Sequence, residues 1–467
     1  MNEYQLIVIG AGPGGYEAAI RAAQLGLTTA LVENRQVGGT CLNRGCIPTK
    51  ALLHVAALYR GVQEFESVGL CAQGVSFDIQ KVHDRKNQVI EQLRSGIEQL
   101  IKANKIDLYQ GTGTLTGPHS VTVATGEGPV ELAGENILVA TGSKPSRPPI
   151  PGLDLPHVGT SDEFLFLEDK LYENLIIIGG GVIGVEFASV YQSFGCKVTI
   201  VEAMDRILPP MDREISQNLA MILKKRGVAI HTGAMVERLE ETPQGIACHF
   251  TQKGKEQVVT ADGVLVAIGR RPNTDGLFAE GFSVEMERGR IVTDEAFRTS
   301  VPSIRAIGDV TAKIQLAHMA SAQGLTAVEL IAGKEPSICL TAVPGCVYTD
   351  PEIATVGLTE EECKEKGIAV RKGKYIMSGN GKSIIEQADR GFIKLLFDEK
   401  TDVLLGAHLM CCRATDLISE LSTAIVNKLT SKELSSVIRP HPTFTEAVTE
   451  AVESAHGMAI HLAPAKK

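Results

Sequence analysis

The stretch Gly38–Lys50, GGTCLNRGCIPTK, places two cysteines five residues apart between glycine-rich turns and the start of a helical pattern. Pro48 suits a first helical turn, and the apolar spacing of TKALLHVAALYRGV predicts an amphipathic helix behind it. A helix N-terminus favours a nearby thiolate, which is the reactive form of cysteine. A disulfide between Cys41 and Cys46 would close so small a loop that it would stabilise the fold little. The stretch therefore favours a reversible redox disulfide.

Two alternatives stay open from spacing alone: a zinc half-site and two unrelated buried cysteines. Zinc would need two further ligands at short spacing, and the sequence has no second Cys/His pair of that kind. Cys411 and Cys412 are adjacent, with only His408 nearby. We therefore expect no metal site.

The N-terminus carries a dinucleotide-binding pattern. Residues Gln5–Gly10 predict an apolar strand, followed by GAGPGG, a helix and a second strand that ends at Glu33. The glycines Gly10, Gly12 and Gly15 allow a tight turn and the close approach of a pyrophosphate to the helix N-terminus. Glu33 can accept a hydrogen bond from a ribose hydroxyl. With strand, helix and acid in place, the pattern predicts a dinucleotide site.

The same pattern recurs at residues 174–202, NLIIIGGGVIGVEFASVYQSFGCKVTIVE. Its glycines are Gly179, Gly181 and Gly184, and its second strand ends at Glu202. Two such units imply two dinucleotides, in the simplest case a tightly held flavin and an exchangeable nicotinamide. Glu202, with no arginine directly after it, favours NAD over NADP, whose extra phosphate would meet the carboxylate.

Length, charge and apolar runs limit the class of protein to which this chain can belong. The chain has 467 residues and a net charge of −9 with both signs mixed, which does not suggest nucleic acid or an anionic membrane. The first residues already read as a buried strand, and the longest apolar run, 175–195, contains Glu186. We therefore expect a soluble, cytoplasmic protein. The other eight cysteines are expected to be inert and mostly buried: Cys71, Cys196, Cys248, Cys339, Cys346, Cys363, Cys411 and Cys412.

Further elements follow along the chain. The pattern predicts a helix over 79–105, a proline-rich connector over 140–152 and a short buried strand ending in Asp309. A longer helix is expected from Ala414 to Leu429. Near the C-terminus, His441 lies among prolines and Glu446 opens a helix. On sequence alone His441 could be a capped turn histidine, Glu446 an ordinary helix-start carboxylate and Lys50 a solvated lysine.

These segments together resemble the pyridine nucleotide–disulfide oxidoreductases. The redox stretch, GAGPGG, GGGVIGVE, AIGRRPNT, IGDV, TDPEIATVGLTE and HPTFTEA occur in the family's order and spacing over essentially the whole chain. Within the family, the chain looks most like the members that oxidise dihydrolipoyl groups for 2-oxoacid dehydrogenase and glycine cleavage complexes.

The resemblance implies an α/β fold with two Rossmann-like dinucleotide-binding domains and a C-terminal α+β dimerisation domain. The expected division is 1–150 for FAD, 151–272 for NAD, 273–340 returning to the FAD domain, and 341–467 for the interface. It also implies a two-fold dimer whose active sites are shared between chains, with lipoyl domains as partners.

Residue roles follow from the same resemblance. Cys46 would lie next to the flavin and Cys41 would meet the substrate. His441 would be the general base, held by Glu446, since a histidine near neutral pH can take and return a thiol proton. Lys50, paired with Glu186, would lie near the flavin. The other expected flavin contacts are Gly10, Gly12, Gly15, Glu33, Gly113, Gly142, Asp309 and Ala317, and the NAD contacts are Gly179, Gly181, Gly184, Glu202, Val236 and Gly269.

Some positions depart from the family's usual residues. They are Arg44, Thr49, Met319, Thr355, Arg439 and Pro440. Of these, Arg439 and Pro440 are expected to flank the path of the substrate. Rival reactions within the family are those of glutathione, mercuric and large thioredoxin reductases. Glu202 speaks against the first two, and the tail HLAPAKK lacks the cysteine pair that the last two require. A non-catalytic flavin-binding scaffold is a further alternative, but a scaffold has no use for the cysteines or for His441 and Glu446.

Overall fold

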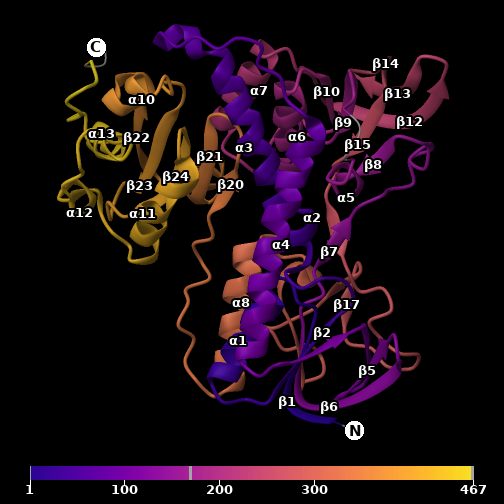
Figure 1. Cartoon of the computed structure of the whole chain (residues 1–467). Helices are drawn as coiled ribbons and strands as arrows, with labels where there is room; N and C mark the ends of the chain where they lie inside the picture. Colours follow the sequence, from indigo (N-terminus) through magenta and orange to yellow (C-terminus); the bar gives the residue numbers. More distant parts are fainter. Residues whose placement is uncertain (1, 168–170, 464–467) are drawn as a thin grey trace.

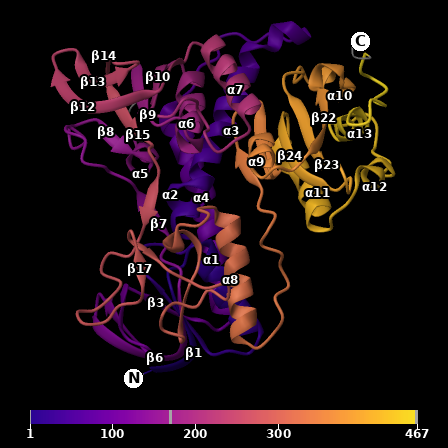
Figure 2. The same ribbon diagram turned by 180° about the vertical axis from the view of Figure 1, so that it is seen from behind.

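The computed structural model describes residues 2–167 and 171–463, which form three larger sheets with helices around them. Figure 1 shows the first sheet beside the N-terminus at the bottom, the second at the top, and the third at one side with the C-terminus. The reverse view shows the C-terminal body again set to one side of the other two (Figure 2). The fold class expected from the sequence is confirmed.

The first sheet has a parallel core, β3-β2-β1-β6, extended by antiparallel β5 and β4. Its central strands are apolar and buried on both faces, as a parallel sheet covered by helices requires. The strands are β1 (Asn2–Ile9), β2 (Thr29–Glu33), β3 (Asp107–Gln110), β4 (Thr112–Gly117), β5 (Ser120–Thr125), β6 (Gly128–Val139) and β19 (Ile304–Ala306), which pairs with β6. The helices packed nearby are α1 (Pro13–Gln24), α4 (Ile79–Ala103) and α8 (Ala317–Ile331).

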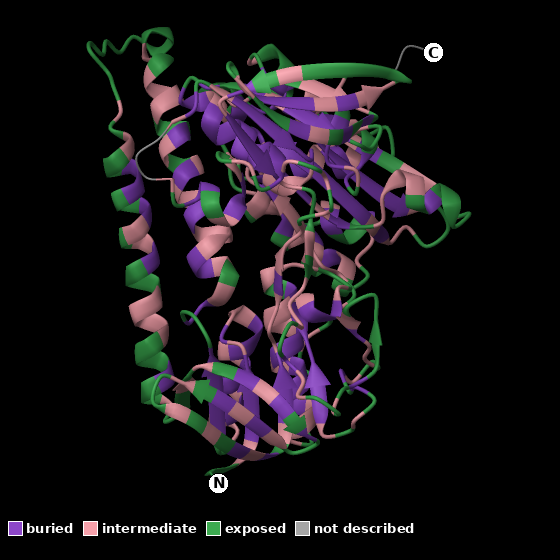
Figure 3. Cartoon of the chain, turned by 90° about the vertical axis from the view of Figure 1, so that its right-hand side faces the viewer, coloured by how far each residue is buried: buried purple, intermediate pink, exposed green. Residues whose placement is uncertain are grey.

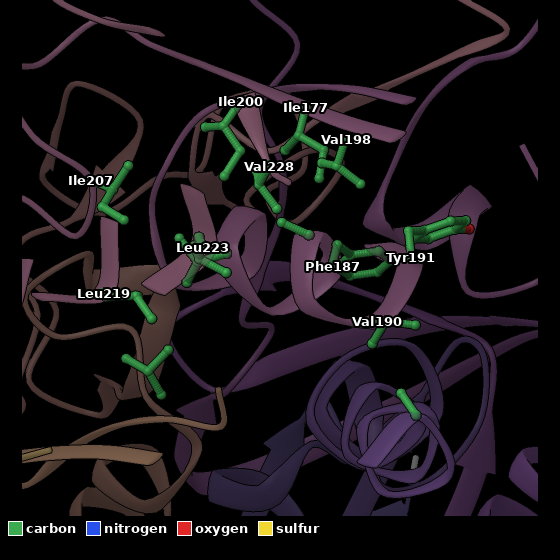
Figure 4. Packing of buried hydrophobic residues seen from close by; sticks show 14 of the residues in the cluster. Ile177, Phe187, Val190, Tyr191, Val198, Ile200, Ile207, Leu219, Leu223 and Val228 are labelled. Carbon is green, nitrogen blue, oxygen red and sulfur yellow. The ribbon is translucent and has the colours of Figure 1, made fainter. Parts of the chain in front are cut away.

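The second sheet is parallel, in the order β11-β10-β9-β15-β8. Apolar side chains of its strands, such as Ile177 and Ile200, pack against Phe187 and Leu223 of the covering helices (Figure 4). Its strands are β8 (Val158–Thr160), β9 (Asn174–Ile178), β10 (Lys197–Glu202), β11 (Ala229–Thr232) and β15 (Gly263–Val266), with helices α6 (Val182–Ser193) and α7 (Arg213–Lys225). An antiparallel sheet follows β11: β12 (Ala234–Thr242), β13 (Gly245–Gln252) and β14 (Lys255–Ala261).

The third sheet is antiparallel, in the order β20-β21-β24-β23-β22. On strand β23, Leu395 packs into the core between the third sheet and its helices. Phe392 packs instead into the core of the second sheet and its helices, which we call the second unit. Both faces of β23 are therefore buried. Its strands are β20 (Gly345–Val347), β21 (Glu352–Gly357), β22 (Val370–Ile376), β23 (Phe392–Asp398) and β24 (Leu404–Cys411). Its helices are α9 (Glu360–Glu365), α10 (Gly381–Ile385), α11 (Ala414–Val426), α12 (Ser431–Ser435) and α13 (Glu446–Ser454).

The redox stretch forms two consecutive helices, α2 (Gly39–Arg44) and α3 (Cys46–Gln63), and α3 packs against both α4 and α6. It therefore lies where the first and second units meet. Burial follows the layers, with the strands mostly buried and the surface helices mixed (Figure 3). The remaining short elements are α5 (Ser161–Phe164), η1 (Phe65–Val68), η2 (Gly308–Thr311), η3 (Met377–Gly379), β7 (Ser143–Pro145), β16 (Arg270–Pro272), β17 (Met286–Glu287) and β18 (Arg290–Ile291).

Several element boundaries differ from the sequence-based expectation; the helix expected over 79–105, for example, ends at Ala103. Two further differences have a clear physical reason. The strand expected to reach Asp309 ends at Ala306, because Gly308 takes a left-handed backbone conformation and Asp309 lies in the short helix η2. The helix expected to reach Leu429 ends at Val426, since Lys428 is also left-handed and stops it. Pairing of β19 with β6 is the arrangement expected if 273–340 returns to the first unit, but the domain boundaries themselves stay predictions.

Exposure of two cysteines also differs from the expectation. Cys71 and Cys339 are exposed, while Cys196, Cys248 and Cys363 are buried. Both exposed thiols lie in irregular segments, where no periodic apolar pattern predicts burial. Among the described residues, no helix combines the length and apolar character needed to cross a membrane. The cytoplasmic location stays a prediction.

Gly15 and Gly96 lie in different environments, and substituting each of them tests how closely helix α1 packs on its strand turn. A Cβ atom at Gly15 would lie 1.8 Å from the carbonyl oxygen of Gly10, whereas one at Gly96 in α4 meets nothing within 4 Å. We expect Gly15→Ala to lower the free energy of unfolding by about 3 kcal/mol or more through overpacking. Gly96→Ala should raise it by about 1 kcal/mol through helix propensity. Thermal unfolding measures both, and equal midpoints would contradict the packing role of Gly15.

Candidate active site

A cavity of about 1720 Å³ lies between the glycine turns of the first and second units. Its walls include residues that follow β1, β2, β9 and β10, so it lies at the carboxyl ends of both parallel sheets, where open α/β sheets bind ligands. The expected site residues that line it are Gly10, Gly12, Glu33, Cys41, Cys46, Lys50, Gly113, Gly142, Gly179, Gly181, Glu186, Glu202, Val236, Gly269, Asp309 and Ala317.

Four expected site residues do not line this cavity. Gly15 and Gly184 lie in the first turns of α1 and α6, where a Cβ atom would meet the carbonyl oxygen of Gly10 at 1.8 Å or of Gly179 at 2.0 Å. They therefore allow each helix to pack closely on its own strand turn. The other two, His441 and Glu446, belong to the C-terminal body.

The two cysteines are free thiols joined by a hydrogen bond. Cys41 lies in α2, and Cys46 is the first residue of α3, so the positive end of the α3 dipole faces its sulfur. The hydrogen bond from Cys41 lowers the pKa of Cys46 to about 7 against the opposing effect of burial, and the charge of Lys50 also lowers it. Donation of that bond, together with burial, raises the pKa of Cys41. Cys46 is therefore the thiolate of the pair.

Lys50 and Glu186 form an ion pair beside these thiols. The Lys50 Nζ atom lies 2.8 and 3.0 Å from the two carboxylate oxygens of Glu186, whose side chain is 3% exposed. The backbone N–H of Tyr348 donates to the same carboxylate at 3.0 Å, and the Tyr348 ring lies under the Lys50 ammonium. The pair thus links the redox helix to the second unit and to the third sheet.

The two glycine-turn units have matching geometry. Helices α1 and α6 begin after Gly12 and Gly181 with no side-chain cap and no acidic residue in the first turn. Their first N–H groups are therefore available to a phosphate. Both oxygens of Glu33 accept backbone N–H groups, from Ala11 at 2.8 Å and Arg35 at 2.7 Å.

Glu202 repeats the arrangement of Glu33 in the second unit. It accepts the N–H of Gly180 at 2.5 Å and that of Met204 at 2.7 Å. These bonds fix each carboxylate at the end of its strand, beside its glycine turn. Each carboxylate is therefore held in a fixed position at the cavity wall.

Several polar groups in the cavity fit bound dinucleotides. Among the described residues, the buried hydroxyl of Thr141 has no hydrogen-bond partner. Burial raises the pKa of Asp309, whose carboxylate accepts a hydrogen bond from Ser143 at 2.6 Å. Gly142 and Gly269 have left-handed backbones with no described atom within 4 Å of an added Cβ. The cavity thus has both unsatisfied polar atoms and room for a ligand.

His441 is well exposed, with 80% of its side chain accessible. Its Nδ1 atom lies 2.8 Å from Glu446, whose second oxygen accepts the N–H of Thr443 at 2.9 Å. Although partial burial acts to raise it, the pKa of Glu446 is lowered by the Thr443 N–H and by His441. This geometry leaves Nε2 free to exchange a proton, but within one chain His441 is not part of the cavity that holds the thiols.

Arg439 has a buried side chain in the C-terminal body. Its side chain is 4% exposed, forms an ion pair with Glu420 and donates to Thr449 at 2.8 Å. Arg439 therefore braces α11 against α13, and its expected place beside the path of the substrate stays a prediction. Its neighbour Pro440 accepts a hydrogen bond from Thr443 at its carbonyl group.

Three features were missed by sequence reasoning. His461 pairs with Glu450 at 2.7 Å, one helical turn from the His441–Glu446 pair. Cys346 lines the cavity, and Tyr348 contacts the Lys50–Glu186 pair. None of these belongs to a short motif, so only the folded chain reveals them. His318 is exposed at the cavity wall, where its Nε2–H donates a hydrogen bond to the carbonyl oxygen of Pro344 at 2.8 Å.

Comparison with known proteins gives full-length matches. Residues 4–324 match the family model described as pyridine nucleotide-disulphide oxidoreductase, and residues 343–452 match its dimerisation domain. A dihydrolipoyl dehydrogenase of Bacillus subtilis is 43% identical, covering 98% of this chain and 99% of the relative. One from Geobacillus stearothermophilus is 38% identical, covering 98% of each chain.

Solved structures agree with these matches. LpdA from Mycobacterium tuberculosis superposes with a TM-score of 0.88 at 27% identity, covering 97% of this chain and 99% of that one. The HOCl-induced flavoprotein disulfide reductase RclA from Escherichia coli superposes with a TM-score of 0.85 at 32% identity, covering 96% and 99%.

The hydrogen bond between the cysteines can be tested by thiol titration. In the reduced protein, alkylation of Cys46 by iodoacetamide should reach half its maximal rate near pH 7, because only the thiolate reacts. Cys41→Ala removes the donor, so this midpoint should rise by about one pH unit or more, toward that of an ordinary thiol. Mass spectrometry of the peptide measures the rate, with exposed Cys71 as internal reference. An unchanged midpoint would contradict the assignment.

Proposed function

Because the chain belongs to the pyridine nucleotide–disulphide oxidoreductases, we propose that it is a dihydrolipoyl dehydrogenase. It oxidises a protein-bound dihydrolipoyl group to the cyclic disulfide and reduces NAD. The observation that carries the proposal is the hydrogen-bonded pair Cys41–Cys46, in a cavity between two glycine-turn units. The proposed partners are lipoyl domains of 2-oxoacid dehydrogenase or glycine cleavage complexes.

Each dinucleotide has a proposed set of residues. The first unit, 1–150 with 273–340, holds FAD through the N-terminus of α1, Glu33 and Asp309. The second unit, 151–272, holds NAD through the N-terminus of α6 and Glu202. When bound, FAD would supply an acceptor for an electron pair from the enzyme dithiol, and NAD would supply the final acceptor of that pair as hydride.

The protein's own residues carry out the thiol chemistry. The cycle begins with a Cys41–Cys46 disulfide. His441 removes the proton from one substrate thiol, and the resulting thiolate attacks the sulfur of Cys41. A bond forms between substrate and Cys41, the Cys41–Cys46 bond breaks, and Cys46 leaves as the thiolate that its surroundings favour.

The second half of the exchange completes the oxidation. His441 releases the first proton to solvent and then takes the proton of the second substrate thiol, whose thiolate attacks the substrate sulfur of the mixed disulfide and closes the lipoyl ring. Cys41 leaves and takes the proton from His441, so the substrate loses two electrons and the cysteine pair gains them. Glu446 keeps the ring oriented and stabilises its protonated form.

The base comes from a second copy of the chain in this proposal. His441 and Glu446 fall within residues 343–452, which match a dimerisation domain, and His441 is exposed rather than facing the thiols of its own chain. A two-fold dimer is the commonest soluble assembly, and it would bring each His441 to the cysteine pair of the partner. Residues 341–467 are thus the proposed interface.

An NADH-production assay with dihydrolipoamide tests the reaction. The FAD-loaded enzyme should turn over with NAD, whereas Cys41→Ser and Cys46→Ser should abolish turnover. His441→Ala should lower it about 10²- to 10⁴-fold, the usual contribution of a general base. Cys339→Ser is the matched control, because this exposed thiol lies outside the cavity, and it should retain full activity. Faster reduction of glutathione by NADPH, or no activity with dihydrolipoamide, would overturn the proposal.

Nucleotide preference provides a second test. Glu202 would accept from the adenosine ribose hydroxyls and repel a 2′-phosphate, so the unmodified enzyme should strongly prefer NAD. Glu202→Gln removes the charge and should lower the ratio of kcat/KM for NAD to that for NADP about tenfold or more. Steady-state kinetics with both nucleotides measure this ratio. Equal use of NAD and NADP by the unmodified enzyme would refute the role of Glu202.

A further inference from the structure

A buried ion pair joins the C-terminal body to the second unit. Lys394 on β23 and Asp212, which caps the N-terminus of α7, lie 2.7 Å apart, and their side chains are only 2% and 3% exposed. Lys394 also contacts Glu360 at 3.2 Å and Glu214 at 3.5 Å. Removing one partner of such a pair leaves a buried charge without compensation, so the pair strongly constrains the position of both segments.

Further ion pairs cross the same junction nearer to solvent. Arg206 and Arg213 each contact Glu361 of α9 at 3.0 Å, and Lys374 of β22 pairs with Glu214. Exposed pairs of this kind contribute little each. They nevertheless show that residues 206–214 are held against the C-terminal body at several points, with Lys394–Asp212 as the buried centre.

The other side of this segment supports the second glycine turn. The N–H of Leu208 donates to the carbonyl of Gly180 at 2.8 Å, and the N–H of Met204 donates to Glu202 at 2.7 Å. A Cβ atom on Gly180 would lie 2.8 Å from Ile207. Leu208 itself has a left-handed backbone, a conformation that persists in a non-glycine residue only when its surroundings impose it.

We propose that Lys394 is a positioning residue for the second nucleotide site. By holding Asp212, it fixes segment 203–212, and that segment fixes the Gly180 turn and the Glu202 carboxylate. The inference rests on the proposed assignment of this site to NAD. It means that the C-terminal body contributes to NAD affinity although Lys394 does not line the cavity.

The test compares NAD binding with local mobility. Lys394→Met should raise the Kd for NAD about tenfold, measured by calorimetric titration of the oxidised, FAD-loaded enzyme, in which no electron transfer takes place. Without NAD, amide hydrogen exchange should become faster in 203–212 and 179–184. Asp212→Asn/Lys394→Met removes both charges, which avoids a buried uncompensated charge. It should show the same weak binding, because the tether is still absent.

Leu395→Ala is the matched control. Leu395 is fully buried next to Lys394 on the same strand, but it faces the core of the C-terminal body. This variant should lower the thermal midpoint without changing the Kd for NAD or the exchange of 203–212. If Leu395→Ala weakened NAD binding as much as Lys394→Met does, the proposal would be overturned, because a general loosening of the C-terminal body would then explain both effects.

Three other results are decisive. Near-native binding by the double variant would also overturn the proposal, since an uncompensated charge would then explain the effect of Lys394→Met. So would unchanged exchange in Lys394→Met. If the unmodified enzyme binds no NAD, the nucleotide assignment is wrong, and the exchange comparison alone decides whether Lys394 positions the segment.

Discussion

The carboxylate of Glu186 joins three parts of the chain that are far apart in sequence. It lies in α6 of the second unit, binds Lys50 of the redox helix, and accepts the N–H of Tyr348 beside β20. A buried carboxylate without such partners would be strongly unfavourable, so each partner has to be in place for α6 to pack as it does. The same contacts fix Lys50 one turn after Cys46. The position and charge state of the thiol pair therefore depend on this interaction.

The features that depend on local chemistry were the ones predicted best from the sequence. A glycine turn between an apolar strand and a helix, followed by an acid, indicates a dinucleotide unit because each residue type has a steric or electrostatic role at a fixed spacing. Both units have that geometry, and Glu33 and Glu202 accept backbone N–H groups in the same manner. The position of Cys46 at a helix start could also be predicted, because Pro48 and the apolar spacing mark the first turn.

Other features depend on contacts between distant segments, which no spacing encodes. The Lys50–Glu186 pair was expected only through family resemblance, and sequence patterns gave no sign of the Lys394–Asp212 pair. The sequence position of Arg439 near His441 likewise does not reveal that its side chain is directed toward Glu420. Helix and strand ends were misjudged where a left-handed residue, such as Lys428, stops the element.

Within one chain, the two thiols are enclosed by a cavity, whereas the proposed base is exposed at the surface. Cys41 and Cys46 line a large cavity, whereas His441 is 80% exposed on the C-terminal body. In the proposed mechanism, proton transfer from a substrate thiol requires the base within hydrogen-bond reach, which two chains would provide across an interface. We therefore propose that each active site is built by two chains.

Mixed dimers of two inactive variants test this claim most directly. Cys46→Ser and His441→Ala proteins are unfolded and refolded together, and the heterodimer is isolated with the aid of different affinity tags. If the sites are shared, one site of the heterodimer has both defects and the other is intact, so activity should be about half that of the unmodified dimer. If each site lies within one chain, both sites keep one defect. An inactive heterodimer, shown to contain both variants, would contradict the account.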